Sequence, residues 1–284
     1  MKIGFIDHHL NNYHANKFLS IIKDGKAGEG LEVVAAYESN GEGEDWCAKN
    51  NIPRAASAAE VVEKSDAIIV LAPDNIDAHV ELSKEALQSK KPVLIDKVLA
   101  SNVEDAMKIV TDAKTAGTPI MTASSLRFSV ELDQLLALVG QGPYEGIFSR
   151  GFGKWRGYAV HTIQPALRLL GGRVKRVIDT GQGTTHLITI ENDKGNRAFI
   201  DLRECENQYE ATPWQIGILH HKNYEVITIK KFDEFYENLL KNAVKFFQTG
   251  ISPVPVEEML DQVLVEAAAD NSFNNGGQWV TVGS

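Results

Sequence analysis

Acidic and imidazole side chains crowd the segment DHHLNNYH (7–14), which follows the apolar run KIGFI (2–6). Asp7, His8, His9 and His14 are residue types that can bind zinc or another borderline metal. They can also contact a substrate or a cofactor, and an Asp or Asn here can simply cap the following helix. The spacing matches no recognised metal pattern, and adjacent histidines cannot easily both ligate in a short turn. We therefore expect no metal site and leave the other two roles open.

Two further residues have side chains suited to proton transfer. Lys97 directly follows the apolar run PVLID (92–96), and His161 lies near the start of an expected helix over 159–170. An ammonium at the end of a strand can donate to a developing alkoxide, or act as a base if its pKa falls. An imidazole titrates near neutral pH and can exchange a hydroxyl proton.

The segment KWRGY (154–158) places aromatic rings beside two cations, just before His161. Rings and cations in this arrangement suit sugar stacking or anion binding, although a solvated loop would have the same composition. The candidate substrate contacts are Arg127, Trp155, Arg156 and Tyr158.

The composition excludes several classes of protein. The chain has 284 residues, of which 43% are hydrophobic and 24% charged, as in soluble globular proteins. A net charge of -9 disfavours nucleic acid or an anionic membrane surface as the main partner. There is no signal peptide pattern and no long apolar run, and Cys47 and Cys205 form no recognisable pair. These features together predict a cytoplasmic protein that acts on a small molecule.

The first part of the chain alternates strands with helices. Strands are expected at 2–6, 31–37, 66–72, 92–96 and 119–123, and helices at 13–23, 45–51, 59–64, 77–89 and between Ser101 and Gly117. Ser57 with Glu60, and Ser101 with Glu104, have capping-box spacing. Alternation of this kind predicts a doubly wound parallel sheet.

The pattern changes after residue 123. A helix is expected to begin in 124–140, and strands are expected in the runs YEGIFSRGF, KRVIDTG, THLITIEND, NRAFIDLREC, PWQIGILHH and YEVITIK. Residues 192–196 are typical of a hairpin turn, and two helices are expected over 231–248 and 256–271. This predicts an antiparallel sheet of four to six strands; Gln208, Tyr209, His220 and His221 fall on it without an assigned role. The predicted domains are 1–123 and 124–284, with a ligand between them.

Several segments together resemble one known family. They are DAIIVLAPD (66–74) followed by His79, KPVLIDK (91–97), and the pair Arg127-Phe128. Their order is similar to the A-T-P-N, H, G-K-x-V-x-x-E-K-P and R-F elements of the Gfo/Idh/MocA family of glucose–fructose oxidoreductases and inositol dehydrogenases. His161 with Leu170-Gly171, and GISPVPVEE (250–258), resemble that family's G-x-H-x-x-D…L-x-G and G-x-x-P-x-x-x-x-E elements.

The resemblance implies a Rossmann domain that binds NAD or NADP and a second domain whose open sheet supports a homodimer or homotetramer. It implies hydride transfer on a small sugar, polyol or related carbonyl compound. Lys97 would lie near the nicotinamide and the reacting oxygen, and His161 would be the acid/base. The residues implied to contact the cofactor are Asp7, His8, His9, Asn12, Glu38, Ala72, Pro73, Asp74, His79 and Asp96.

The turn after the first strand departs from the family pattern. The positions of its G-x-G-x-x-G glycines carry Asp7, His9 and Asn12, and we expect Asp7 to point negative charge towards the diphosphate. Glu38 matches the acid that binds the adenosine ribose, which favours NAD over NADP.

The proton-transfer positions depart from the pattern as well. Gly157 and Gln164 replace two carboxylates around His161, and Val98 replaces the proline after the lysine. Two other hypotheses therefore stay open: a non-catalytic ligand-binding relative that serves as a sensor or subunit, and metal-assisted lyase or hydrolase chemistry at the histidine cluster.

Overall fold

The computed structural model describes residues 1–205 and 213–283, and the chain divides into two compact units. The first unit comprises residues 1–123 and 236–259, and the second comprises 124–235 and 260–284. The segment 236–259 thus returns to the first unit from far along the chain, and nothing in its sequence pattern indicates that return. In the part of the chain described, no helix combines the length and apolar character needed to cross a membrane.

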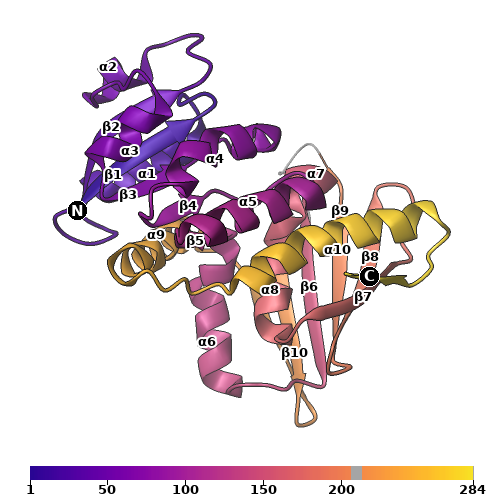
Figure 1. Ribbon diagram of the computed structural model, residues 1–284. Coiled ribbons are helices and arrows are strands. Elements are labelled where there is room, and N and C mark those ends of the chain that lie inside the picture. The colour runs from indigo at the N-terminus through magenta and orange to yellow at the C-terminus, as the bar shows by residue number, and fades with distance from the viewer. Residues whose placement is uncertain (206–212, 284) are drawn as a thin grey trace. The chain divides into compact units, whose positions relative to one another are not determined.

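The first unit is a five-stranded parallel sheet in the order β2-β1-β3-β4-β5 (Figure 1). Its strands are β1 (Lys2–Asp7), β2 (Glu32–Glu38), β3 (Ala67–Val70), β4 (Val93–Ile95) and β5 (Ile120–Met121). Its helices are α1 (Tyr13–Lys23), α2 (Trp46–Asn50), α3 (Ala58–Lys64), η1 (Ile76–Ala78), α4 (His79–Leu87) and α5 (Val103–Ala116). The predicted Rossmann-type alternation is confirmed, and the fully buried β3 explains the continuous apolar run in its sequence.

Local side-chain contacts set where these helices begin and end. Asn12 caps α1 through its side chain, and Gly117 ends α5 with a φ of 73°. Ser57 caps α3 as its capping-box spacing predicted. The prediction of a second capping box that begins at Ser101 was wrong, because Asn102 accepts the amide of Asp105 at the start of α5.

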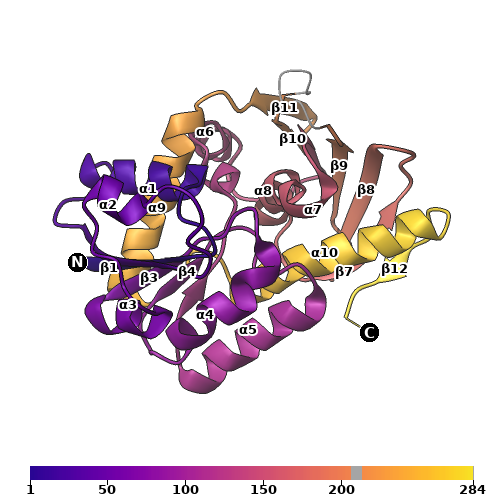
Figure 2. The same cartoon turned by 90° about the horizontal axis from the view of Figure 1, so that it is seen from above.

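Helix α9 (Phe232–Thr249), which belongs to the first unit from Tyr236 onwards, lies beside α1 (Figure 2). Tyr236 packs its ring against the rings of His14 and Phe18, with centroids 5.6 and 6.2 Å apart. Lys26 pairs with Glu237 at 3.0 Å. An aromatic contact with α1 and an ion pair with Lys26 after it therefore join this late segment of the chain to the start of the first unit.

The second unit is built on a seven-stranded sheet in the order β11-β10-β6-β9-β8-β7-β12. Its strands are β6 (Gly146–Phe152), β7 (Val174–Asp179), β8 (Thr185–Asn192), β9 (Arg197–Arg203), β10 (Gln215–His220), β11 (Asn223–Thr228) and β12 (Val280–Thr281). Its helices are η2 (Ser125–Phe128), α6 (Val130–Val139), α7 (Trp155–Tyr158), α8 (Val160–Leu170) and most of α10 (Val256–Asn274).

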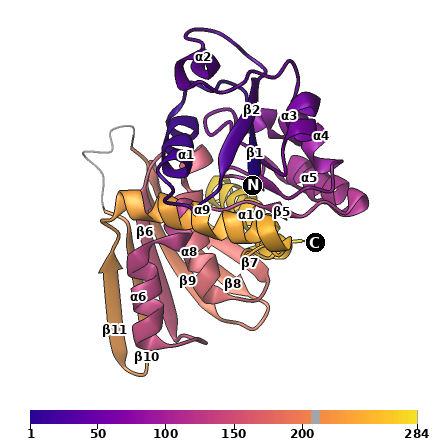
Figure 3. The same cartoon turned by 90° about the vertical axis from the view of Figure 1, so that its left-hand side faces the viewer.

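This sheet has more strands than the expected four to six, and the expectation that it is mainly antiparallel is confirmed. Strands β6 and β9 pair in parallel, with Ile147 opposite Ala198, while the other pairs are antiparallel. A parallel pair joins segments distant in sequence, so local patterning cannot reveal it. Helix α8 packs against β6 and β9 and covers one face of the sheet (Figure 3). The predicted hairpin at 192–196 is confirmed by the β8–β9 pairing.

Candidate functional site

Asp7 ends β1, and its side chain is completely buried. Its carboxylate accepts the amides of Ala72 at 3.0 Å and His9 at 3.1 Å, and the side-chain amide of Asn12 at 2.8 Å. Burial raises the pKa of Asp7 to about 7, although these hydrogen bonds act to lower it. The expectation that Asp7 points its charge outwards is wrong, because the buried backbone donors around it draw the carboxylate inwards.

Three backbone amides of the turn, those of His9, Leu10 and Asn12, are bonded within the protein. The amide of Leu10 donates to Glu38 Oε2 at 2.8 Å, and that of Asn12 donates to the carbonyl of Leu10 at 2.8 Å. The amides of Ser39 and Asn40 in turn donate to the carbonyls of residues 7 and 8 at 3.0 and 2.8 Å. A glycine-rich turn offers its amides to a diphosphate, whereas in this turn the amide of Leu10 bonds Glu38 at the end of β2 and those of His9 and Asn12 bond within the turn. The turn therefore does not fit a diphosphate in the glycine-loop manner.

Glu38, at the end of β2, is buried and already carries partners. Its Oε2 accepts the amide of Leu10, and its Oε1 pairs with Arg54 at 2.9 Å. The Arg54 guanidinium also reaches Asp45 at 2.7 Å, and these two hydrogen bonds raise its pKa above the usual range. The acid expected to hold ribose hydroxyls is thus bonded to an arginine that is itself 39% exposed.

The three histidines of the turn point to different partners. His8 Nδ1 lies 3.0 Å from Ser39 Oγ, and His9 Nδ1 lies 3.3 Å from the carbonyl of Asn40. His14 Nδ1 instead bonds the carboxylate of Asp96 in the protein interior. Among residues 1–205 and 213–283, no three His, Cys, Asp or Glu side chains converge to hold a metal ion.

Residues 72–79 continue from the carboxyl end of β3. Ala72 has a φ of +60°, which is rare for a residue with a side chain and is held here by the bond from its amide to Asp7. His79 is fully buried, with Nε2 2.9 Å from the carbonyl of Leu71 and Nδ1 3.2 Å from that of Leu99. Burial lowers the pKa of His79. Its ring therefore braces the backbone around Ala72, while Pro73 is buried and Asp74 exposed beside it.

Asp96 and Lys97 follow β4, and both are buried. Lys97 Nζ donates to the carbonyl of Pro73 at 3.3 Å, so its ammonium lies at the carboxyl end of the parallel sheet. Burial acts to raise the pKa of Asp96, but the charge and hydrogen bond of His14 leave it below its usual value. His14 Nε2 lies 3.4 Å from the hydroxyl of Tyr236, which completes a Tyr–His–Asp chain beside Lys97. The peptide bond from Lys97 to Val98 is cis.

In the second unit, His161 is buried in the first turn of α8. Its Nδ1 lies 2.8 Å from Ser124 Oγ, and Gln164 Oε1 accepts the amide of Ser124 at 2.6 Å. Gln164 stands where the family pattern has a carboxylate. Here the side chain of Gln164 accepts the backbone amide of Ser124, and the hydroxyl of Ser124 bonds Nδ1 of the His161 imidazole.

The expected substrate contacts are in different environments within this unit. Arg127 is buried in η2, and its carbonyl accepts a hydrogen bond from Arg168. Arg156 is exposed, and Tyr158 is 41% exposed with its ring edge-on to His161 at 5.4 Å. Trp155 is half-buried because its ring stacks on His186.

His186, Asp179 and Glu204 form a cluster that sequence reasoning missed. His186 Nδ1 lies 2.6 Å from Asp179 Oδ2, and its Nε2 lies 3.6 Å from Glu204 Oε1. The only sequence signal was a histidine at an inward-facing position of the run THLITIEND. His220 ends β10, and His221 follows it in the turn, whereas Gln208 and Tyr209 lie outside the described residues.

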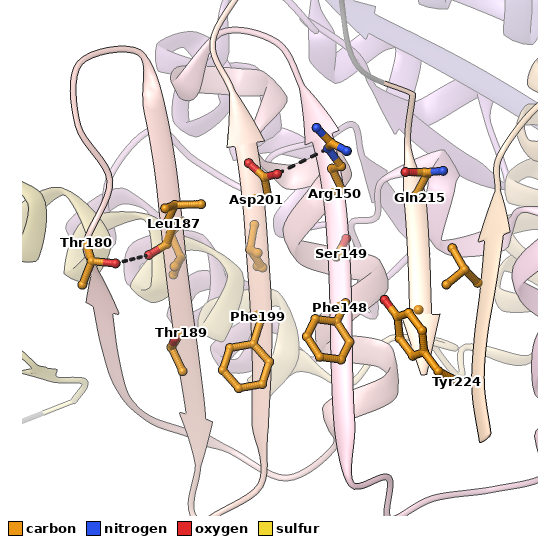
Figure 4. A pocket seen from close by; sticks show the side chains of 14 residues that line it. Phe148, Ser149, Arg150, Thr180, Leu187, Thr189, Phe199, Asp201, Gln215 and Tyr224 are labelled. Atoms are coloured by element: carbon orange, nitrogen blue, oxygen red, sulfur yellow. Dashed lines mark hydrogen bonds and ion pairs between the residues drawn. The ribbon is translucent and has the colours of Figure 1, made fainter. Parts of the chain in front are cut away.

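The face of the second sheet opposite α8 carries apolar side chains around a shallow pocket (Figure 4). Phe148 stacks on Phe199 at 5.2 Å, and Tyr224 lies edge-on to Phe148 at 5.4 Å. All three rings are more than a third exposed. The Arg150–Asp201 ion pair, at 3.3 Å, marks one end of this patch (Figure 4).

Comparison with known proteins identifies the first unit. Residues 4–124 match the GFO_IDH_MocA family model, described as an oxidoreductase family with an NAD-binding Rossmann fold. The Escherichia coli K12 protein "Uncharacterized oxidoreductase YdgJ" is 21% identical over 203 residues, which are 64% of this chain. The match spans 57% of that relative's length.

Solved structures share the fold over nearly the whole chain. A probable dehydrogenase from Thermotoga maritima superposes with a TM-score of 0.83 at 16% identity, covering 99% of both chains. The myo-inositol dehydrogenase of Lactobacillus casei, solved with NAD(H) and myo-inositol, gives 0.78 at 15% identity and covers 100% of this chain and 97% of its own. The match over residues 4–124 thus assigns the first unit to the NAD-binding Rossmann fold of the Gfo/Idh/MocA oxidoreductase family, and the chain as a whole shares the two-sheet fold of these solved structures.

Proposed function

We propose that this protein is an NAD(P)-dependent oxidoreductase that acts on a small sugar, polyol or related carbonyl compound. The observation that carries the proposal is the buried ammonium of Lys97 at the carboxyl end of β4, within the residues that match the NAD-binding family. Ligands of open parallel sheets bind at this edge. A nicotinamide would supply the hydride acceptor or donor. The unit around 1–123 is assigned to the cofactor and the chain from 124 onwards to the substrate.

Lys97 and His161 are assigned the proton chemistry. The Lys97 ammonium would donate a hydrogen bond to the reacting oxygen and stabilise negative charge on it. The His161 imidazole would exchange the hydroxyl proton through Nε2, since Ser124 holds Nδ1. Arg127, Arg156 and Tyr158 are assigned to the substrate.

The cofactor diphosphate requires contacts other than the turn amides. We assign these contacts to His8 and His9, which are half-buried in the turn and whose imidazoles can bind anions when protonated. Glu38 and Arg54 are assigned to the adenosine ribose, and Ala72, Pro73 and Asp74 line the same edge of the sheet.

Cofactor binding tests the proposal directly. The purified chain is titrated with NADH and with NADPH, following energy transfer from its tryptophans and the change in melting temperature. Saturable binding followed by turnover on one member of a polyol and sugar panel is expected. Absence of any response at millimolar cofactor would exclude the proposal.

A second candidate is a ligand-binding relative that senses a metabolite without catalysis. The observation in its favour is the closed turn, whose amides are bonded to Asp7, Glu38 and Leu10. Sugar binding without cofactor binding, or cofactor binding without turnover over the whole panel, would support this candidate instead.

We further propose that the chain forms a homodimer or homotetramer through the exposed face of the second sheet. Phe148, Phe199 and Tyr224 form an apolar patch of the kind that commonly marks an interface. Light scattering coupled to size exclusion would give the mass; a monomer at micromolar concentration would refute the assembly. The free cysteines Cys47 and Cys205 fit the reducing cytoplasm that we propose as its location.

A further inference from the structure

Trp155 is held at three points by the second unit. Its backbone amide donates to Glu204 Oε2 at 3.0 Å, and its indole N–H donates to Asp270. Its ring stacks on the imidazole of His186, with centroids 4.2 Å apart and planes only 18° from parallel. Contacts from β8, from α10 and from the residue after β9 thus converge on one residue of the segment KWRGY.

His186 lies between acidic groups and aromatic rings. Asp179 at the end of β7 bonds Nδ1 at 2.6 Å, and Glu204 after β9 lies 3.6 Å from Nε2. Asp270 on α10 adds a third carboxylate, whose charge acts on that of His186. Phe273 on α10 lies against the ring with a centroid distance of 4.9 Å. An imidazolium here would satisfy two carboxylates and bind the face of the Trp155 ring.

The backbone of the segment 154–158 is helical only in part, although the amide of Ala159 donates to the carbonyl of Trp155 at 3.3 Å. Arg156 has a ψ of 120° and Gly157 a φ of 85°, so the backbone leaves helical geometry within α7. Tyr158, at the end of this break, contacts His161 edge-on. The position of Trp155 therefore affects the residues on either side of the break.

We propose that His186, as an imidazolium stacked on Trp155, is a positioning residue that holds segment 154–158 in place for substrate, and that loss of its proton loosens the segment. The effect on substrate rests on the proposed function; the proton-dependent contact with Trp155 does not.

The acidic groups set the direction of the effect. Burial alone lowers the pKa of His186, but the hydrogen bond that it donates to Asp179 and the charges of Asp179 and Glu204 outweigh burial and raise that pKa above 6.5. Burial also raises the pKa of Asp270, against the bond from Trp155 and the charge of His186. His186 therefore keeps its proton to a higher pH than an ordinary histidine does, and the contact is lost as the pH rises through the raised pKa.

Tryptophan fluorescence tests the contact without any substrate. An imidazolium quenches the fluorescence of an indole on which it stacks. The Trp155 signal is obtained by subtracting the emission of a Trp155→Phe variant from that of the native chain at each pH. We expect this signal to increase as the pH rises, with a single midpoint above pH 6.5. The transition should be absent in His186→Phe, which retains an aromatic ring. His221→Gln, an exposed histidine, is the matched control and should keep the transition.

Histidine NMR gives a second measurement in the native chain in case His186→Phe does not fold. The resonance of His186 should titrate with the same midpoint as the fluorescence. In Trp155→Ala that midpoint should fall, because the protonated form loses its aromatic partner. A fluorescence transition that persists in His186→Phe, or a His186 midpoint that is the same in Trp155→Ala, would overturn the proposal.

Substrate kinetics supply the remaining readout once turnover is found. KM should rise about three- to tenfold across the same midpoint in the native chain, with kcat changed less, as for a cation–π contact worth on the order of one factor of ten. In His186→Phe, KM should not change across the pH range of this transition. If the fluorescence transition is present but KM in the native chain is independent of pH, the contact with Trp155 is correct and the functional assignment is wrong.

Discussion

The carboxylate of Asp7 accepts a hydrogen bond of 3.0 Å from the backbone amide of Ala72, and this contact joins the carboxyl ends of β1 and β3. It lies where the family pattern places the first glycine of the dinucleotide turn. The buried carboxylate holds Ala72 at a φ of +60° and closes the turn through His9 and Asn12. A residue that seemed to oppose a diphosphate thus acts as an internal connection between two strands.

Asp7→Asn should remove a pH dependence of stability. The folded pKa of Asp7 is about 7 against an ordinary 3.8, so the folded state binds a proton that the unfolded chain releases between these values. Stability therefore falls as the pH rises from about 4 to about 7, by at most about 4 kcal/mol. Urea unfolding at pH 5 and pH 8 measures the difference, which should shrink in Asp7→Asn and persist in Asp24→Asn, an exposed control. An equal pH dependence in both variants would contradict this assignment.

His14→Phe should destabilise the protein by about 3 to 5 kcal/mol, because it leaves the buried Asp96 carboxylate without its imidazole partner. His14→Phe/Asp96→Leu removes both members and should cost less than the single change. Chemical denaturation of the single and double variants measures the coupling. Simple additivity of the two single costs would show that the pair is not coupled.

Arg54→Met should shift the preference between cofactors towards NADH. The change releases Glu38 Oε1 for ribose hydroxyls and removes a cation suited to a 2′-phosphate. We expect the ratio of the NADPH to the NADH dissociation constant to rise by about tenfold. Lys49→Met, which removes an exposed cation paired with Glu44, is the control. An unchanged ratio would mean that Arg54 does not face the ribose.

Lys97→Met should lower kcat by about 100-fold or more while cofactor affinity changes little, because the ammonium is assigned to the reacting oxygen. Lys84→Met, an exposed lysine on α4, should leave kcat unchanged. Single-turnover measurement of hydride transfer distinguishes this loss from slow product release. A variant with normal kcat would remove Lys97 from the chemistry.

The sequence by itself determined the Rossmann-type alternation and the family resemblance of residues 4–124, and it singled out Lys97 and His161 as candidates, because these depend on periodicity and on short linear motifs. It could not show which way the side chain of Asp7 points. That direction depends on the amide of Ala72, 65 residues further along the chain.

Tertiary structure also decided the partners of Glu38, His14 and Trp155. Arg54, Asp96 and His186 reach them across turns and strands, and no linear spacing encodes those meetings. The parallel pairing of β6 with β9 and the return of residues 236–259 to the first unit have the same cause. Local sequence sets the type of each element, but burial and hydrogen-bond satisfaction between distant segments decide which charged groups become internal connections and which remain for a ligand.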